Sequence, residues 1–192
     1  MLKRCHWAQD PLFHAYHDTE WGVPVHDDRV HFEFLVLEGA QAGLSWATIL
    51  KRRTGYREAF CDFDAEKISQ FGEEDFERLM QDSAIIRNRL KIRSVINNAQ
   101  RYLDVQREFG SFNAYIWQFV GHAHIVNAWE NMSQIPATSK ESEALSADLK
   151  ARGFTFVGPT IMYAHMQAVG MVNDHELSCF RYQELLHADS NA

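Results

Sequence analysis

The sequence predicts an all-α protein, and three observations support this prediction. No proline interrupts the chain between Val25 and Ile135. Apolar residues in that stretch recur at helical rather than alternating spacing, as they do along one face of a helix. Capping residues such as Asp, Ser and Asn precede several of these stretches, and Gly follows them. With 192 residues, of which 46% are apolar, the chain is long enough for one domain with a substantial core.

The first half of the chain should contain three helical segments. One helix is expected to begin near Asp27 or Asp28, and its apolar period continues as far as Leu50. Gly39 and Gly43 should interrupt that helix. Shorter helices are expected over 65–71 and 73–81, and the three acidic residues in the first turn of the second one suit the helix dipole.

A long helix should follow and end near Gly110, because six apolar residues fall on one helical stripe. These residues are Ile92, Val95, Ile96, Ala99, Tyr102 and Leu103. A further helix is expected from Ser111 or Asn113 to Val120. Residues 126–138 contain a proline and polar residues and should form a connection.

Two more helices are expected near the C-terminus. Thr138 or Ser139 should cap the first, which ends at Gly153. A turn over 157–160, with a capping residue, should precede a buried helix over 161–169. We expect residues 1–188 to form the single domain and residues 189–192 to be a disordered tail.

Composition excludes several classes of protein. With 23% charged and 12% aromatic residues, the bulk of the chain cannot be intrinsically disordered. The most apolar stretch, 32–50, carries two glutamates and a glutamine, so no membrane-spanning segment is expected. The N-terminus lacks the apolar region of a secretory signal. Three cysteines are too few for a disulfide-stapled scaffold, and the cytoplasm is the expected compartment.

The net charge of −7 argues against an anionic partner, but its distribution does not. Residues 83–103 contain five basic residues and no acidic one. These five are Arg87, Arg89, Lys91, Arg93 and Arg101. A basic strip on an acidic body can dock a phosphate backbone locally, although a solvated helix face would show the same pattern.

Two cysteines and two histidines near the chain ends form a candidate metal site. Cys5 and His17 lie near the N-terminus, and His175 and Cys179 share one helical face near the C-terminus. Two thiolates and two imidazoles make a closed tetrahedral set suited to structural Zn²⁺. The spacing alone is a weak signal, and buried cysteines with core histidines are the alternative. Cys61 has no histidine nearby and is interpreted as a core residue.

Aromatic residues concentrate near one carboxylate. Four of them lie within the first 21 residues, and a fifth follows Glu38 by eight positions. The five are Trp7, Phe13, Tyr16, Trp21 and Trp46. Aromatic side chains usually belong to the core, but this concentration also suits a pocket that stacks on a planar ring. Glu38 lies beside the apolar stripe, so it is either a buried acid or an ordinary solvated glutamate.

The segment 82–92 lies between two expected helices and carries part of the basic strip. Such a junction can present backbone N–H groups at the start of the second helix to a phosphate, with Arg87, Arg89 and Lys91 adding charge. A helix-hairpin-helix near 73–103 would grip DNA in this way without reading its sequence. The chain contains no Gly-rich phosphate loop and no H-E-x-x-H motif.

Several segments together resemble one known family. The chain is similar over nearly its whole length to the bacterial 3-methyladenine DNA glycosylase I family, within the helix-hairpin-helix glycosylase superfamily. The matching segments are Arg4-Cys5-x-Trp7, Gln9-Asp10-Pro11-Leu12, Tyr16-His17-Asp18-x-Glu20-Trp21-Gly22-Val23-Pro24, Leu37-Glu38-Gly39-x-Gln41-Ala42-Gly43-Leu44-Ser45-Trp46, Phe154-x-Phe156-Val157-Gly158 and Val172-Asn173-Asp174-His175.

The resemblance implies a monofunctional base-excision repair enzyme. It would flip 3-methyladenine out of alkylated double-stranded DNA, hydrolyse the N-glycosidic bond and leave an abasic site. The resemblance also implies one structural zinc, with the four ligands on Cys5, His17, His175 and Cys179. The free product would be 3-methyladenine, and the enzyme would be a monomer.

Roles for the pocket residues follow from the same resemblance. Glu38 would accept hydrogen bonds from the flipped base and is the candidate catalytic residue. Tyr16 and Trp46 would sandwich the base, and Trp7 and Trp21 would complete the pocket. A buried carboxylate beside a cationic base would keep its charge. Unlike most of the superfamily, this family lacks a catalytic aspartate and relies on the positively charged leaving group.

The resemblance also implies roles for residues that face the DNA. The Gly43-Leu44 turn would insert into the gap left by the flipped nucleotide. Phe13 stands where relatives often have Tyr, and Ala84 occupies a hairpin position where Gly is usual. Two rival interpretations are a non-catalytic, zinc-stabilised protein that binds damaged DNA and a zinc-tied helical interaction module.

Overall fold

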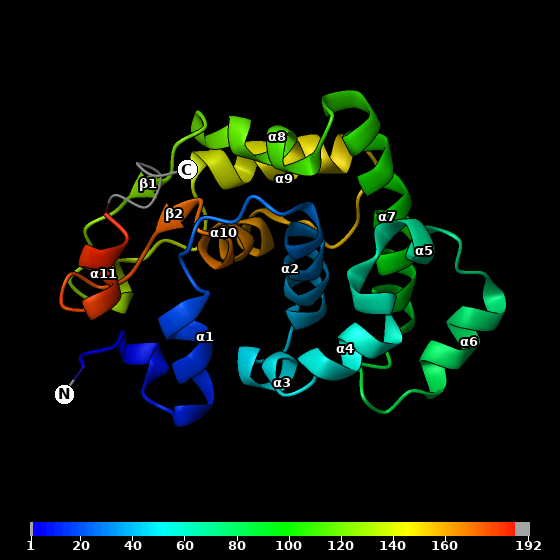
Figure 1. Cartoon of the computed structure of the whole chain (residues 1–192), viewed down its shortest axis with the longest axis horizontal. Helices are drawn as coiled ribbons and strands as arrows, with labels where there is room; N and C mark the ends of the chain where they lie inside the picture. Colours follow the sequence, from blue (N-terminus) through cyan, green and yellow to red (C-terminus); the bar gives the residue numbers. More distant parts are fainter. Residues whose placement is uncertain (1, 187–192) are drawn as a thin grey trace.

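The computed structural model describes residues 2–186 and is mostly helical (Figure 1). The expected tail at 189–192 lies outside the described residues. The α-helices are α1 (His14–Thr19), α2 (Asp28–Gln41), α3 (Trp46–Leu50), α4 (Arg53–Ala59), α5 (Ala65–Ser69), α6 (Glu73–Gln81), α7 (Arg89–Phe109), α8 (Phe112–Trp117), α9 (Lys140–Ala151), α10 (Pro159–Ala168) and α11 (Phe180–Glu184). Short 3₁₀ turns cover His6–Ala8, Pro11–Phe13, Cys61–Phe63, Gln118–Val120 and Met132–Gln134.

The two ends of the described chain meet. Figure 1 shows the N-terminal segment and α1 beside α11 at one end of the molecule, with α5, α6 and α7 at the other. The backbone N–H of Phe180 donates to the carbonyl oxygen of Lys3 at 2.9 Å, which fixes this approach. In the described part of the chain, no helix is long and apolar enough to cross a membrane.

Helix α2 is the centre of the core. The Asp27 carboxylate caps it by accepting from the backbone N–H groups of Arg29 and Val30, as expected. All residues over 31–40 are buried, and α10, α7 and α8 pack around this helix. Because residues 31–40 are buried on all sides of the helix, this stretch shows no narrow apolar stripe, and Glu33 and Glu38 are buried together with the apolar residues.

The expected interruption of α2 at Gly39 is wrong. The helix continues to Gln41, and a Cβ on Gly39 would make an ordinary van der Waals contact with Phe156 Cβ at 3.4 Å. The break comes at Gly43, which has a φ of +75°. The apolar period beyond it belongs to the separate helix α3, whose cap is Ser45.

The later helices agree closely with the sequence. Helix α7 begins after Asn88, whose side chain accepts from the Lys91 backbone N–H, and ends before Gly110 at a φ of +83°. Ser139 caps α9 in a capping box. Helix α10 begins two residues earlier than expected, with Pro159 as its first residue. Proline suits this position, because the backbone N–H that it lacks would have no partner within the helix. Helix α5 ends at Ser69 rather than at 71.

One feature departs from the all-α prediction. The two-residue strands β1 (Ile125–Val126) and β2 (Val172–Asn173) pair in parallel. Strand β1 starts one residue before the region expected to be an irregular connection and includes its first residue, Val126. The pairing holds this connection against the C-terminal segment that carries His175.

Candidate active site and metal centre

The four candidate metal ligands come together, although more than 150 residues separate the N-terminal pair from the C-terminal pair. Their ligand atoms all lie within 4.8 Å of one another, and all four side chains are buried. The Sγ atom of Cys5 is 3.4 Å from His175 Nδ1, and Cys179 Sγ is 3.4 Å from His17 Nε2. We call these four residues the Cys₂His₂ cluster. Its donor set is suited to a tetrahedral divalent cation.

Each histidine of the cluster has a partner on its other ring nitrogen. His17 Nδ1 is 2.8 Å from Asp18 Oδ1, and His175 Nε2 is 3.0 Å from the carbonyl oxygen of Trp21. Arg4 donates to both oxygens of Asp18, and this contact lowers the pKa of that carboxyl to about 2. Such outer contacts fix the ring orientation and tautomer of metal-bound histidines. The surroundings of the cluster therefore fit a bound metal ion.

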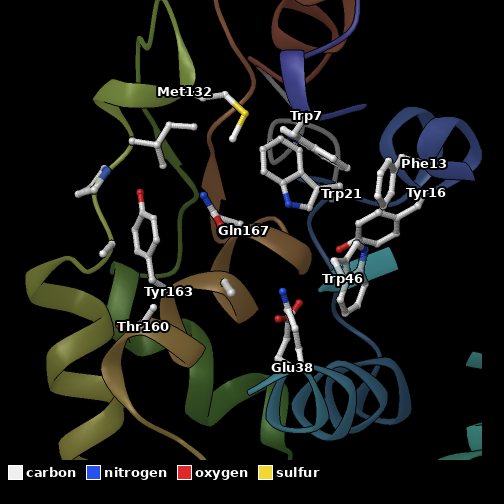
Figure 2. Close-up of a pocket in the computed structure, with 15 residues that line it drawn as sticks. Trp7, Phe13, Tyr16, Trp21, Glu38, Trp46, Met132, Thr160, Tyr163 and Gln167 are labelled. Carbon is white, nitrogen blue, oxygen red and sulfur yellow. The ribbon is translucent and has the colours of Figure 1, made fainter. Parts of the chain in front are cut away.

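A cavity of about 450 Å³ lies next to the cluster, and we call it the aromatic pocket. Figure 2 shows its side chains pointing into one shared space. The N-terminal segment, α2, α3, α10 and the loop before α9 contribute to it. Its lining consists of Trp7, Phe13, Tyr16, Trp21, Glu38, Gln41, Trp46, Met132, Ile135, Pro136, Ala137, Thr160, Tyr163, Ala164 and Gln167.

All five aromatic residues identified in the sequence line this pocket. Trp7 is central among them, with its ring centroid 5.1 Å from Trp21, 5.7 Å from Phe13 and 6.2 Å from Tyr16. The Trp7 and Trp46 indole N–H groups are buried and have no hydrogen-bond partner within residues 2–186. Unpaired buried donors cost free energy, so these groups are available to a ligand.

Tyr16 and Trp46 are neighbours, with ring centroids 5.2 Å apart and planes inclined by 45°. A base stacked between two parallel rings needs about 7 Å between them, since each van der Waals contact takes about 3.5 Å. In this conformation the two rings touch each other. A base can enter between them only if one ring moves, and Trp46, on the short helix α3, is the less buried of the two.

Glu38 is a buried acid, which resolves the alternative left open by the sequence. Its exposed fraction is 5%, and no described residue donates a hydrogen bond to its carboxyl group. Burial raises the pKa of Glu38 to about 8. The side chain points into the pocket from α2 (Figure 2). Without a cationic ligand, the carboxyl group is therefore mostly protonated at neutral pH.

The sequence reasoning missed the α10 wall of the pocket. Thr160, Tyr163, Ala164 and Gln167 line it and follow one another at i, i+3, i+4 and i+7. This is the spacing of one helical face. Three polar residues on one face of a mostly apolar helix are a usable signal. Two of them, Tyr163 and Gln167, donate to Asp174, which directly precedes His175 in the sequence.

The candidate DNA-binding residues fall into two groups. Gly43 and Leu44 are exposed on the turn between α2 and α3, and Leu44 has 41% of its surface accessible. Arg87 and Arg89 are exposed beside the hairpin that joins α6 to α7. Lys91 has other partners, because its ammonium group donates to the carbonyl oxygens of Ala40 and Ala42 at 2.8 and 2.6 Å. It closes the C-terminal end of α2.

The rest of the basic strip is paired within the protein. Arg93 contacts Glu73, and Arg101 contacts Asp104. Ala84, at the hairpin position where a glycine was expected, is exposed and lies against Gly55. A Cβ on Gly55 would lie 2.6 Å from Ala84 Cβ, so the glycine makes room for the alanine methyl group.

Comparisons with known proteins give a consistent result. The model of the methyladenine glycosylase family matches residues 6–182. The DNA-3-methyladenine glycosylase 1 of Escherichia coli (strain K12) is 50% identical over 182 residues, which cover 94% of this chain and 97% of that protein. A crystal structure of 3-methyladenine DNA glycosylase I is 49% identical, with a TM-score of 0.90, and covers 93% of this chain and 98% of its own.

A second solved structure adds a ligand. It is a variant of 3-methyladenine DNA glycosylase I in complex with 3-methyladenine. It is 36% identical to this chain, with a TM-score of 0.89, and covers 92% of this chain and 96% of its own.

Proposed function

Because the chain belongs to the methyladenine glycosylase family, we infer that it excises 3-methyladenine from alkylated DNA by hydrolysing the N-glycosidic bond. The observation that carries this inference is the aromatic pocket with one buried, unpaired carboxyl group. The damaged nucleotide must leave the base stack, because the bond to be cleaved is inaccessible within a duplex. The pocket volume exceeds that of one purine, which leaves room for the base to enter.

We propose that the aromatic rings select the base by its charge. Methylation at N3 makes the adenine in DNA a cation, and a cation over an aromatic face gains about 0.5–2 kcal/mol. Trp46 would move to admit the base against Tyr16, while Trp7 and Trp21 form the rest of the wall. Phe13 contributes an apolar edge to the same wall. Neutral adenine would lack this attraction.

Glu38 would complete the recognition of charge. Its raised pKa reflects burial without a partner, and a cationic base beside it supplies that partner. On binding, the pKa would fall and the carboxyl group would release its proton. The resulting ion pair favours the charged base while it is still bonded to the sugar. Glu38 is therefore proposed as a base-binding residue with an electrostatic part in cleavage.

Asp174 is a buried carboxylate in contact with the pocket residues Tyr163 and Gln167, but its geometry does not suit a general base. Four donors occupy its two oxygens: Asn127, Trp129, Tyr163 and Gln167. A general base needs a free lone pair within reach of the attacking water. The arrangement supports a reaction that depends on the charged leaving group.

The Cys₂His₂ cluster is proposed to hold one structural Zn²⁺. All four ligand positions are protein side chains, so the ion would leave no site for substrate and would add folding free energy. Two free thiols in one buried cluster also favour a reducing compartment, which supports a cytoplasmic location. Elemental analysis of the purified protein should find one zinc per chain. A value near zero in protein that is folded and active would contradict this assignment.

The proposed DNA contacts are the Gly43-Leu44 turn, as a wedge in the duplex, and Arg87 and Arg89, as phosphate ligands. Both groups are exposed. Lys91 is excluded from the phosphate contacts in this proposal, because two of its three N–H donors bind the carbonyl oxygens of Ala40 and Ala42 at the C-terminal end of α2.

The deciding experiment is an assay of released bases. Methylated duplex DNA is incubated with the protein, and free bases are separated by chromatography. We expect 3-methyladenine above the enzyme-free background and no adenine from unmethylated DNA. Binding of methylated DNA without release would instead identify a non-catalytic damage-binding protein.

A further inference from the structure

Asp174 lies behind the α10 wall of the aromatic pocket, directly after β2, and only 1% of its surface is exposed. Its Oδ1 accepts from Asn127 Nδ2 at 2.7 Å and from Trp129 Nε1 at 2.8 Å. Its Oδ2 accepts from the Tyr163 hydroxyl at 2.7 Å and from Gln167 Nε2 at 2.8 Å. Each oxygen thus orients two neighbouring side chains.

These contacts determine the direction of the Gln167 amide. A carboxylate only accepts hydrogen bonds, so Gln167 must turn its NH₂ group toward Asp174 and its Oε1 away. Gln167 lines the pocket, and no residue within 2–186 donates a hydrogen bond to that Oε1. The amide nitrogen and oxygen occupy nearly the same volume, so packing alone would not distinguish the two orientations.

Tyr163 is oriented in the same way. Burial and the hydrogen bond to Asp174 raise the pKa of its hydroxyl, which therefore stays protonated and donates to the carboxylate. Its oxygen keeps lone pairs for the pocket. The α10 wall thus offers acceptors, and Glu38 offers a carboxyl group on the α2 side. An adenine methylated at N3 carries positive charge and an amino group, and both favour acceptors.

We propose that Asp174 is a positioning residue that fixes the Gln167 amide so that Oε1, and not the NH₂ group, faces the bound base. This inference rests on the proposed function and adds a specificity-determining residue, Gln167, to it. The reversed amide would turn two N–H donors toward the amino group of the free base and, in DNA, toward its positive charge as well, which is unfavourable.

The substitution Asp174→Asn is expected to reverse the orientation of the Gln167 amide. The Trp129 indole and the Asn127 amide still require an acceptor, so the remaining oxygen of the new side chain would face them. Its new NH₂ group would then face Gln167, which must turn its own oxygen toward that donor. We expect the affinity for free 3-methyladenine to fall about tenfold, the size of one lost hydrogen bond of this kind. Quenching of tryptophan fluorescence measures it, because three tryptophans line the pocket.

A second substitution should restore the acceptor. In Asp174→Asn/Gln167→Glu, the introduced carboxylate accepts from the new NH₂ group and offers its second oxygen to the pocket. We expect the affinity of this double variant for 3-methyladenine to lie within about threefold of the wild type. The single variant Gln167→Glu differs, because it places the new carboxylate in contact with that of Asp174. A role of Asp174 in stability alone predicts no such recovery. Zinc content is measured in every variant, because Asp174 precedes His175.

Gln167→Met tests the acceptor directly, and Gln106→Met is its matched control. Gln106 Nε2 donates to Asp28 Oδ2 at 2.6 Å, which is the same kind of contact outside the aromatic pocket. We expect weaker base binding in Gln167→Met and unchanged binding in Gln106→Met.

Two outcomes would overturn the proposal: wild-type affinity in Gln167→Met, or a double variant that binds no better than Asp174→Asn. If Asp174→Asn does not fold, Gln167→Met decides alone. Release of 3-methyladenine by the wild type is scored separately. It therefore shows whether the positioning role or the proposed function has failed.

Discussion

The Cys₂His₂ cluster and the aromatic pocket are neighbours, but they differ in whether their buried polar groups have hydrogen-bond partners. Trp21 belongs to the pocket and His175 to the cluster, and their ring centroids lie 4.6 Å apart. In the cluster, both histidines have a hydrogen-bond partner behind them. In the pocket, Glu38 and two indole N–H groups have none within the described residues. Satisfied groups stabilise the fold, whereas unsatisfied ones reduce stability and are available to a ligand.

The same contrast appears along α2. Glu33 and Glu38 are both buried, with 7% and 5% of their surfaces exposed. Glu33 accepts from Arg53 at 2.7 Å and from Arg57 at 3.0 Å, while Glu38 faces the pocket alone. The two glutamates therefore form a matched pair for separating stability from ligand binding.

The largest effect should come from the cluster. In Cys179→Ser we expect loss of the metal and a fall in thermal midpoint of more than about 10 °C. A structural Zn²⁺ contributes roughly 10 kcal/mol in small zinc peptides, and one kcal/mol is worth about 2–4 °C in a chain of this size. Zinc analysis and thermal unfolding measure the two quantities.

Cys61→Ser is the control for this substitution. Cys61 is a free cysteine outside the cluster, so its replacement should leave zinc content unchanged. A Cys179→Ser protein that retains one zinc per chain would remove Cys179 from the ligand set.

The second effect should be confined to the pocket. Glu38→Gln keeps the shape of the side chain and removes the charge, so we expect excision of 3-methyladenine to slow by about 10- to 100-fold. Its thermal midpoint at neutral pH should not fall, because the glutamine has no buried charge to accommodate. Glu33→Gln should do the reverse: it leaves Arg53 without its buried partner and lowers stability. Equal losses of activity and stability in both variants would break the comparison.

The third effect is a dependence of stability on pH. The pKa of Glu38 is about 8 in the folded chain and near its ordinary value of about 4.3 when unfolded. The unfolded state therefore ionises first, and stability is lost as pH rises from about 4.5 to about 8. Relative to Glu38→Gln, the wild type should lose about 3 kcal/mol between pH 5 and pH 7.5. Urea unfolding at several pH values tests this, and parallel curves would show that Glu38 does not titrate in this range.

Helices were predictable from the sequence wherever their ends carry local signals. The caps at Asp27, Ser111 and Ser139 satisfy backbone N–H groups within three residues, so their effect can be read locally. The prediction of a break at Gly39 is wrong because α10, α7 and α8 pack around α2, and these contacts come from far along the chain. The strand pair β1–β2 is likewise non-local, and two residues are too short for an alternating pattern.

At the site, residue type and family resemblance identify the candidate metal ligands and the pocket residues. They do not predict how these side chains are oriented relative to one another. The resemblance placed Tyr16 and Trp46 in one pocket, whereas their mutual contact depends on the position of α3. The basic strip, taken by itself, predicts a free cation at Lys91. Its partners are carbonyl oxygens at the end of α2. A pattern of charged side chains cannot predict contacts to backbone atoms.

The smallest effect concerns the basic strip and distinguishes its two kinds of cation. Arg87 is exposed, so Arg87→Ala should weaken DNA binding a few-fold and reduce the slope of log affinity against log salt by about one. Lys91→Met should leave that slope unchanged, because the Lys91 ammonium group is held by α2. It should instead slow excision, since the turn that carries Leu44 follows the carbonyl oxygens it binds. Titrations at several salt concentrations measure both slopes. A reduced slope in Lys91→Met would return this lysine to the phosphate contacts predicted from the sequence.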